Sequence, residues 1–201
     1  LYAALKPFWS MPSSVDLSEA KTSADLSATA TFSETLGIGG ALGYRFTPMF
    51  RAEGEFSRQQ YDLETVENLT ETVVNDGSGR LTLYNLMVNG YLDFPNSTEF
   101  TPYLGTGVGA TLLDGDNLQA GTAKSLSNVV DGTAWAPTGM VTAGTTYALN
   151  NAFDLDLAYK AFFSGDLSKT RATSDYGSDV LVSHNAVFGM RYNFDSYVFP
   201  E

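Results

Sequence analysis

Two pairs of carboxylates stand two residues apart in the sequence, Glu53 with Glu55 and Asp154 with Asp156. Side chains at this spacing point to the same face of a β-strand, and paired carboxylates can act as general acid and base. The face that they would share also carries cations, which are Arg45, Arg51, Lys160 and Arg191. Because an unpaired buried charge is costly, this mixture of charges predicts a salt-bridge network rather than a catalytic pair.

A second candidate for chemistry is Ser183 beside His184, the single histidine of the chain. A serine activated by a histidine could hydrolyse a lipid ester. Neighbouring residues of a strand point to opposite faces, however, so the two side chains cannot readily pair. We therefore interpret His184 as a histidine at the rim of a sheet, near lipid headgroups.

Two further motifs lack the context that their chemistry requires. Residues 105–110 fit a loose dinucleotide fingerprint, but strand-like alternation continues through them where a helix should begin. Residues 114–117 resemble the start of a calcium loop, but Leu118 and Ser125 occupy positions that need carboxylate or amide ligands. These acidic residues could at most make a loose divalent contact. The sequence thus predicts no catalytic residue, no cofactor and no metal site.

The composition narrows the class of protein. Of the 201 residues, 17% are charged, against about a quarter in an ordinary soluble domain. A net charge of −12 argues against a nucleic-acid partner, which would need clustered Lys and Arg. The absence of Cys excludes disulfides and thiolate metal sites. No run approaches the roughly 18 apolar residues of a transmembrane helix, and the first residues do not form a signal peptide.

A period of two dominates the chain and indicates strands. Leu36, Ile38, Leu42 and Tyr44, for example, alternate with glycine, alanine and arginine. This pattern predicts about eight strands, near residues 1–9, 36–46, 50–57, 82–94, 100–112, 135–147, 153–163 and 182–194. The first is the least regular because Pro7 interrupts it. We expect a single domain.

The predicted connections alternate in length. Residues 47–49, 95–98 and 150–151 are tight turns rich in Pro, Asn, Ser and Thr. Residues 10–33, 62–79, 114–132 and 164–178 are long, polar and mostly acidic. Tight turns at one end and long loops at the other predict an up-and-down meander of four hairpins.

Three features favour lipid outside the sheet over a soluble barrel with an apolar interior. The strands are long enough to cross a bilayer at a tilt, which takes about nine to eleven residues. The other face mixes glycine with charges of both signs, as suits the lumen of a narrow barrel. Aromatic residues gather beside the short turns, where one girdle is expected, and it comprises Tyr44, Phe46, Phe94, Phe100, Tyr147 and Phe153. A barrel in lipid must close, because an open edge would leave backbone groups unpaired in hydrocarbon.

The predicted fold is therefore an all-β, eight-stranded antiparallel up-and-down transmembrane β-barrel over residues 1–194, with a short C-terminal extension over residues 195–201. Its lumen would hold the charge network of Arg45, Arg51, Glu53, Glu55, Asp154, Asp156, Lys160 and Arg191. Narrow barrels of this size usually have filled lumens. We accordingly expect little or no conductance.

Three segments resemble a known family. Residues 101–110 (TPYLGTGVGA), 187–194 (VFGMRYNF) and the GALGYRF segment are similar to the small outer-membrane β-barrels of Gram-negative bacteria, the opacity-protein and surface-antigen-like group. The resemblance implies an assembly signal in the last strand, read by the barrel-assembly machinery and formed by Phe188, Met190, Tyr192 and Phe194. In the family this signal usually closes the chain, whereas seven residues follow it here.

These observations predict a non-enzymatic integral protein of the cell outer membrane that displays four acidic loops outside the cell. The resemblance implies an adhesion, surface-antigen or envelope-structural role. The expected partners are outer-membrane lipid and lipopolysaccharide, the barrel-assembly machinery during biogenesis, and a surface ligand or envelope protein. A narrow pore for small solutes is the first alternative, and a lipid-modifying enzyme is the second.

Overall fold

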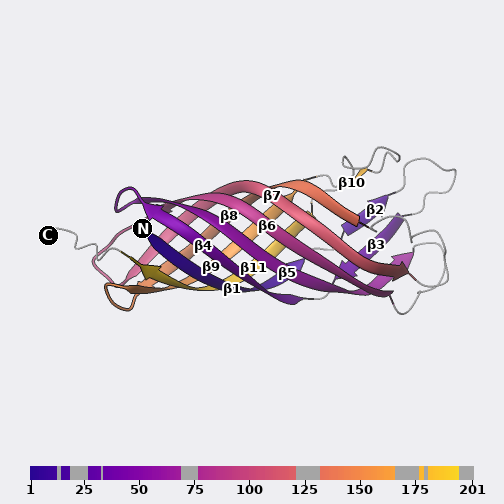
Figure 1. Ribbon diagram of the computed structural model, residues 1–201, viewed down its shortest axis with the longest axis horizontal. Helices are drawn as coiled ribbons and strands as arrows, with labels where there is room; N and C mark the ends of the chain where they lie inside the picture. Colours follow the sequence, from indigo (N-terminus) through magenta and orange to yellow (C-terminus); the bar gives the residue numbers. More distant parts are fainter. Residues whose placement is uncertain are drawn as a thin grey trace.

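The computed structural model of the chain describes residues 1–12, 15–18, 27–32, 34–68, 77–120, 132–165, 177–178 and 181–194. All regular elements in these residues are β-strands (Figure 1). Their bounds are β1 Tyr2–Pro12, β2 Val15–Ser18, β3 Ser27–Phe32, β4 Thr35–Arg45, β5 Phe50–Asn68, β6 Gly77–Asp93, β7 Phe100–Ala120, β8 Gly132–Ala148, β9 Phe153–Ser164, β10 Gly177–Ser178 and β11 Leu181–Asn193. No helix among the described residues is long and apolar enough to cross a membrane.

Eight of the strands form a closed antiparallel barrel, which confirms the predicted fold. Neighbours along the chain pair from β4 to β9, with β9 next to β11. The first strand closes the barrel, because β1 pairs with β4 on one side and with β11 on the other. Pro7 lies within β1: its ladder to β4 is continuous, whereas the ladder to β11 skips Lys6 and Pro7. Proline has no N–H to donate, so one interrupted ladder is the expected consequence.

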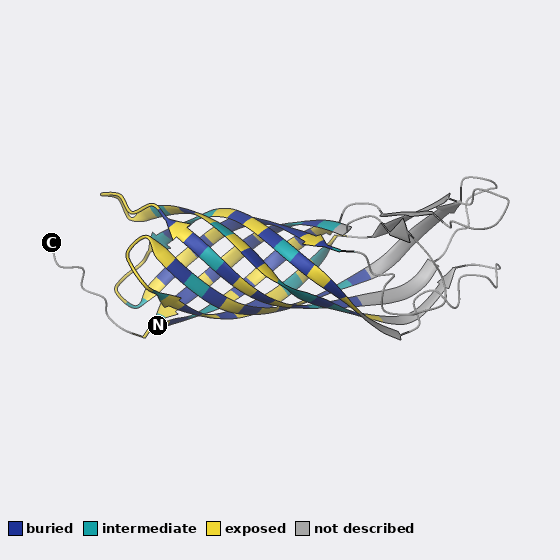
Figure 2. Cartoon of the chain, turned by 90° about the horizontal axis from the view of Figure 1, so that it is seen from above, coloured by how far each residue is buried: buried dark blue, intermediate teal, exposed yellow. Residues whose placement is uncertain are grey.

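The side chains alternate between the two faces of the barrel wall. In Figure 2 buried and exposed residues follow one another along each barrel strand. Outward residues are apolar and exposed, with Leu36 at 78% and Val108 at 71%, whereas the inward Arg51 is fully buried. A water-soluble protein would bury its apolar face instead. This inverted arrangement is the one expected of a barrel in lipid.

The three tight turns lie together at one end of the barrel and are held by polar side chains. Asn150 Oδ1 accepts hydrogen bonds from the backbone N–H groups of Ala152 and Phe153, both at 2.9 Å. Asn96 Oδ1 accepts one from Thr98 N–H at 2.8 Å. Asparagine side chains commonly hold turns in this way. The N-terminus lies at the same end, where Phe194 N–H donates to the Leu1 carbonyl at 3.0 Å.

At the other end several strands run further than the alternation predicts. Residues 62–68 belong to β5, 77–79 to β6 and 114–120 to β7, so the prediction of loops throughout 62–79 and 114–132 was wrong at these margins. Within the predicted first and last long loops, β2, β3 and β10 form a further sheet that pairs with β5 through β3. Backbone pairing continues past the residues that alternate, so the alternation marks only the part of each strand whose outer face is apolar. The rest of the four predicted loops, and residues 195–201, lie outside the described residues.

Candidate functional site: the charged barrel lumen

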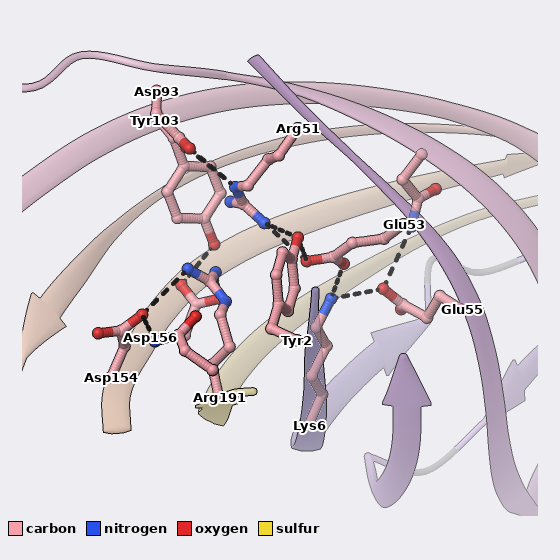
Figure 3. Close-up of polar contacts among 12 residues, drawn as sticks. Tyr2, Lys6, Arg51, Glu53, Glu55, Asp93, Tyr103, Asp154, Asp156 and Arg191 are labelled. Atoms are coloured by element: carbon pink, nitrogen blue, oxygen red, sulfur yellow. Dashed lines mark hydrogen bonds and ion pairs between the residues drawn. The ribbon is translucent and has the colours of Figure 1, made fainter. Parts of the chain in front are cut away.

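Arg51 on β5 is the centre of the polar lumen and is fully buried. Its Nε donates to both carboxylate oxygens of Asp93 at 3.0 and 3.1 Å. Its Nη1 donates to Glu53 Oε1 at 2.6 Å and to the Tyr2 hydroxyl at 3.2 Å (Figure 3). The guanidinium carbon also lies 3.9 Å from the ring centroid of Tyr91. One cation thus joins β1, β5 and β6 across the lumen.

Glu55 accepts hydrogen bonds from opposite walls of the barrel. The Lys160 ammonium of β9 reaches its two oxygens at 2.5 and 2.7 Å, although the residues are 105 positions apart. The Lys6 ammonium of β1 donates to Glu55 at 2.9 Å and also to Glu53. Asn89 completes the set at 3.2 Å. These contacts fix the distance between β5 and the far wall, because every partner is buried.

Arg191 on β11 organises a second group nearer the short turns. Its Nη2 donates to Asp156 at 3.1 Å, and its Nη1 lies 3.6 Å from Asp154. The Tyr103 hydroxyl donates to the other Asp156 oxygen at 2.7 Å. The Arg191 guanidinium carbon lies 4.8 Å from the Tyr2 ring centroid, so the two groups meet at this tyrosine.

Of the eight residues predicted for the lumen network, the structure brings seven into ion pairs. The exception is Arg45, which is half-buried and makes no hydrogen bond to a described residue. It lines a cavity of about 360 Å³ at the short-turn end, together with Asp93, Asp154 and Arg191. With Lys6 and Asp93 included, the set holds five cations and five carboxylates. The lumen is therefore electrically balanced within the described residues.

The sequence analysis did not identify Tyr2, Lys6 or Asp93 as members of the network. Asp93 follows the buried Asn89 and Tyr91 at alternate positions of β6, so the alternation alone could have placed it in the lumen. Lys6 and Tyr2 lie on the strand that Pro7 interrupts, where the alternation was least regular. Their contacts with Glu53 depend on strand pairing, which places β1 and β5 on either side of β4.

Beyond the charged layer the lumen is closed by neutral side chains. Hydroxyls and amides bond in sequence around the wall from Ser57 through Asn85 and Thr111 to Thr138, at 2.6 to 3.1 Å. An apolar cluster lies further toward the long-strand end, and its members are Tyr61, Leu83, Leu113 and Ala136. Between the charged and neutral layers is a cavity of only about 10 Å³, close to the space of one water molecule. The described lumen is thus packed from Arg51 to Tyr61.

Inward glycines make room for the aromatic residues of this lumen. Tyr2 lies directly opposite Gly43 in the ladder, and a Cβ at Gly43 would come within 2.1 Å of the tyrosine ring. Tyr103 has the same relation to Gly144, at 2.6 Å. The outward Gly54 and Gly90, by contrast, have open space where a Cβ would be. Glycine on the inward face is therefore a packing requirement.

The remaining predicted residues lie on the outer surface. The girdle residues border the short turns, and four of them touch in two pairs, with ring centroids 4.9 Å apart for Tyr44 and Phe46 and 4.8 Å apart for Phe100 and Tyr147. The residues predicted as the assembly signal, Phe188, Met190, Tyr192 and Phe194, are all exposed on β11 or at its end. Ser183 is buried inside, whereas the His184 ring lies outside and bonds the Tyr159 hydroxyl. These two residues therefore form no catalytic pair.

Comparisons with known proteins agree with this architecture. The family model described as outer membrane protein beta-barrel domain matches residues 11–199. Outer membrane protein PagN of Salmonella typhimurium is 33% identical over 126 residues, which cover 57% of this chain and 50% of PagN. An uncharacterized protein of Brucella abortus is 26% identical over 144 residues, covering 62% and 49%. The chain thus spans about half the length of the curated relatives it matches.

Solved structures share the fold at low sequence identity. Neisserial surface protein A aligns with a TM-score of 0.56 and 18% identity, over 96% of this chain and 97% of the other. OprG of Pseudomonas aeruginosa aligns with a TM-score of 0.52 and 16% identity, over 95% and 94%. Both likenesses concern the fold.

Proposed function

This chain belongs to the outer membrane protein β-barrel domain family, and from that premise we propose that it displays acidic segments at the cell surface without acting as an enzyme. In this proposal the barrel is the membrane anchor, and the long strands and their connections point out of the cell. The role would be adhesion, surface antigenicity or support of the envelope.

The packed lumen is the observation that carries this proposal. Glu55 on β5 is buried in an ion pair with Lys160 on β9, across the barrel, and in a second pair with Lys6 on β1. Neutral and apolar layers follow this charged layer. A protein that passes no solute through its lumen must act through its ends or its outer wall. The rigid barrel then serves to present the segments at its long-strand end.

The distribution of charge also favours the long-strand end of the barrel as the end that binds a ligand. The lumen set is balanced, so the net charge of −12 belongs to the rest of the sequence. The four segments 10–33, 62–79, 114–132 and 164–178 carry thirteen carboxylates and four cations. A surface ligand of this end would accordingly be basic or bound through cations.

We also propose partners within the envelope. Outer-membrane lipid and lipopolysaccharide would surround the exposed apolar wall. The barrel-assembly machinery would read the outward residues Phe188, Met190, Tyr192 and Phe194 during biogenesis. The short turns would face the periplasm, where an envelope protein could bind.

A narrow pore is the second candidate function, and the cavity of about 360 Å³ at the short-turn end favours it. The cavity ends at Asp93 and Arg191, where the charged layer begins. Conduction would require these ion pairs to separate. A lipid-modifying enzyme remains the third candidate, with no Ser183–His184 pair to support it.

Planar-bilayer recording separates display from conduction. Folded protein, verified by its shifted mobility on an unheated gel, should give no steady channels. Steady open channels would overturn the proposal in favour of a pore. Mass spectrometry of lipid A from cells with and without the protein tests the enzymatic candidate, and we expect identical spectra.

The orientation has its own test. An epitope tag placed within residues 69–76, which join β5 to β6, should bind antibody on intact cells. The matched control is the same tag within residues 95–98, the short turn between β6 and β7, which should bind only after permeabilisation. The reverse result would place the long strands inside the cell envelope and refute surface display.

A further inference from the structure

Arg58 on β5 is an exception on the outer wall. Among the barrel residues whose side chains the structure describes, it is the one Lys or Arg that faces outward. Its neighbours on the same face of β5 are Phe56, which is 52% exposed, and Gly54. A cation on a wall built for lipid is costly unless it reaches the headgroups.

The position of Arg58 along the strand agrees with the edge of the hydrocarbon. It follows Phe50, the first residue of β5, by eight positions. At about 3.3 Å per residue and a tilt of about 40°, this places it roughly 20 Å above the short-turn end. The apolar band of such barrels is about 25 Å tall. The outward series also turns polar here, because Gln60 follows.

Neighbouring side chains hold the Arg58 guanidinium against the wall. Its carbon lies 5.8 Å from the ring centroid of Tyr84, which itself stacks on Phe56 at 6.3 Å. Its Nη2 donates to Gln60 Oε1 at 3.3 Å. Within the part of the chain that the structure describes, no carboxylate pairs with it. The guanidinium is thus oriented while its charge stays available.

The surface around this group is suited to acyl chains. Ile38 lies opposite Arg58 in the β4–β5 ladder and is 55% exposed. Leu86 lies opposite Phe56 on β6 and is also exposed. A molecule bound here would meet one cation at the headgroup level and an apolar wall below it.

We propose that Arg58, positioned by Tyr84, binds a phosphate group of lipid A in the outer leaflet, with acyl chains lying along Ile38, Phe56 and Leu86. Guanidinium groups bind phosphate oxygens through paired N–H donors, which gives both charge and geometry. The choice of lipid A over a phospholipid rests on the orientation proposed above. The phosphate site itself is inferred only from Arg58 and the exposed apolar residues around it, and does not depend on that orientation.

Native mass spectrometry of the folded protein in a nonionic detergent tests this site. Three added lipids serve as probes: bisphosphorylated lipid A, the same lipid A without phosphates, and phosphatidylglycerol. The natural protein should bind the phosphorylated lipid A about tenfold better than the dephosphorylated form, the effect of a charge-assisted hydrogen-bonded contact. Arg58→Gln should lose that preference, and Arg58→Lys should keep part of it.

Tyr84 supplies matched variants. Tyr84→Phe keeps the ring and should keep the preference, whereas Tyr84→Leu removes the ring and should weaken it. Every variant is checked for folding by its mobility on an unheated gel. An unchanged preference in Arg58→Gln would overturn the site, and equal binding of phosphatidylglycerol would overturn the assignment to lipid A. Neither result bears on channel recording or on the tag experiment, so failure of the site and failure of the proposed function are separable.

Discussion

Arg51 shows how a single residue can decide the stability of a narrow barrel. It bonds Asp93, Glu53 and Tyr2, and it is fully buried. Replacing it by alanine would leave Asp93 buried without its cation and Glu53 with Lys6 and Tyr2 alone, and breaking a buried pair in this way typically costs about 3–5 kcal/mol. We expect Arg51→Ala to lower the free energy of unfolding by about that amount, measured by urea titration with gel mobility as the readout.

Arg58→Ala is the matched control for Arg51→Ala, because both remove an arginine from β5. Arg58 is exposed, so its removal should change the unfolding midpoint little. Equal midpoints for the natural protein and Arg51→Ala would contradict the account of the network.

The contacts of Glu55 predict an asymmetry between its two sides. Glu55 retains Lys6 and Asn89 when Lys160 is removed. Lys160, in contrast, bonds no other carboxylate among the described residues. Glu55→Gln should therefore destabilise more than Lys160→Met, by roughly 1 kcal/mol or more. The same urea titration measures both variants, and a larger loss in Lys160→Met would show that the pairing is assigned wrongly.

Part of this network follows from local spacing alone. Arg51, Glu53 and Glu55 stand two apart, so a period of two suffices to place them on one face. The contacts of Lys6 and Tyr2 with Glu53 depend instead on strand pairing, which places β4 between β1 and β5. The distinction is one of range, since strand alternation is local and strand pairing is not.

At the scale of the strands, inward glycines and aromatic residues form matched pairs across neighbouring ladders. Gly43→Ala would force a methyl group into the Tyr2 ring. Overpacking of this kind costs about 1–3 kcal/mol. We expect that loss in unfolding free energy for Gly43→Ala, together with slower folding into lipid vesicles.

The outward Gly54 supplies the comparison for Gly43. No atom lies within 4 Å of a Cβ built there, and glycine is a weak strand former. Gly54→Ala should therefore leave stability unchanged or raise it slightly. A loss as large as that of Gly43→Ala would mean that alanine perturbs these strands through backbone effects instead of lumen packing.

The ends of the longest strands could not be predicted from the sequence. Alternation located all eight barrel strands because lipid on one side and a polar lumen on the other impose opposite demands on successive residues. Beyond the apolar band both faces of β5, β6 and β7 can be polar, so the residues of these strands at that end read as loop. Backbone pairing there is set by the partner strand, as between β3 and β5, and leaves no period in the sequence.

At the scale of the whole molecule, the barrel is inverted relative to a water-soluble protein: charges are balanced and enclosed, and apolar side chains cover the outside. Trp9 and Trp135 are the two tryptophans of the chain, and both are exposed on that outer wall, at 52% and 53%. They make natural probes of the medium that surrounds the barrel.

Quenching of tryptophan fluorescence in vesicles tests this claim most directly. Lipids brominated along their acyl chains should quench both residues strongly, whereas aqueous iodide should quench them little. Trp9→Phe and Trp135→Phe assign the signal to each site. Strong quenching by iodide with none by brominated lipid would show that water, and not hydrocarbon, covers the apolar wall, and would contradict the membrane barrel.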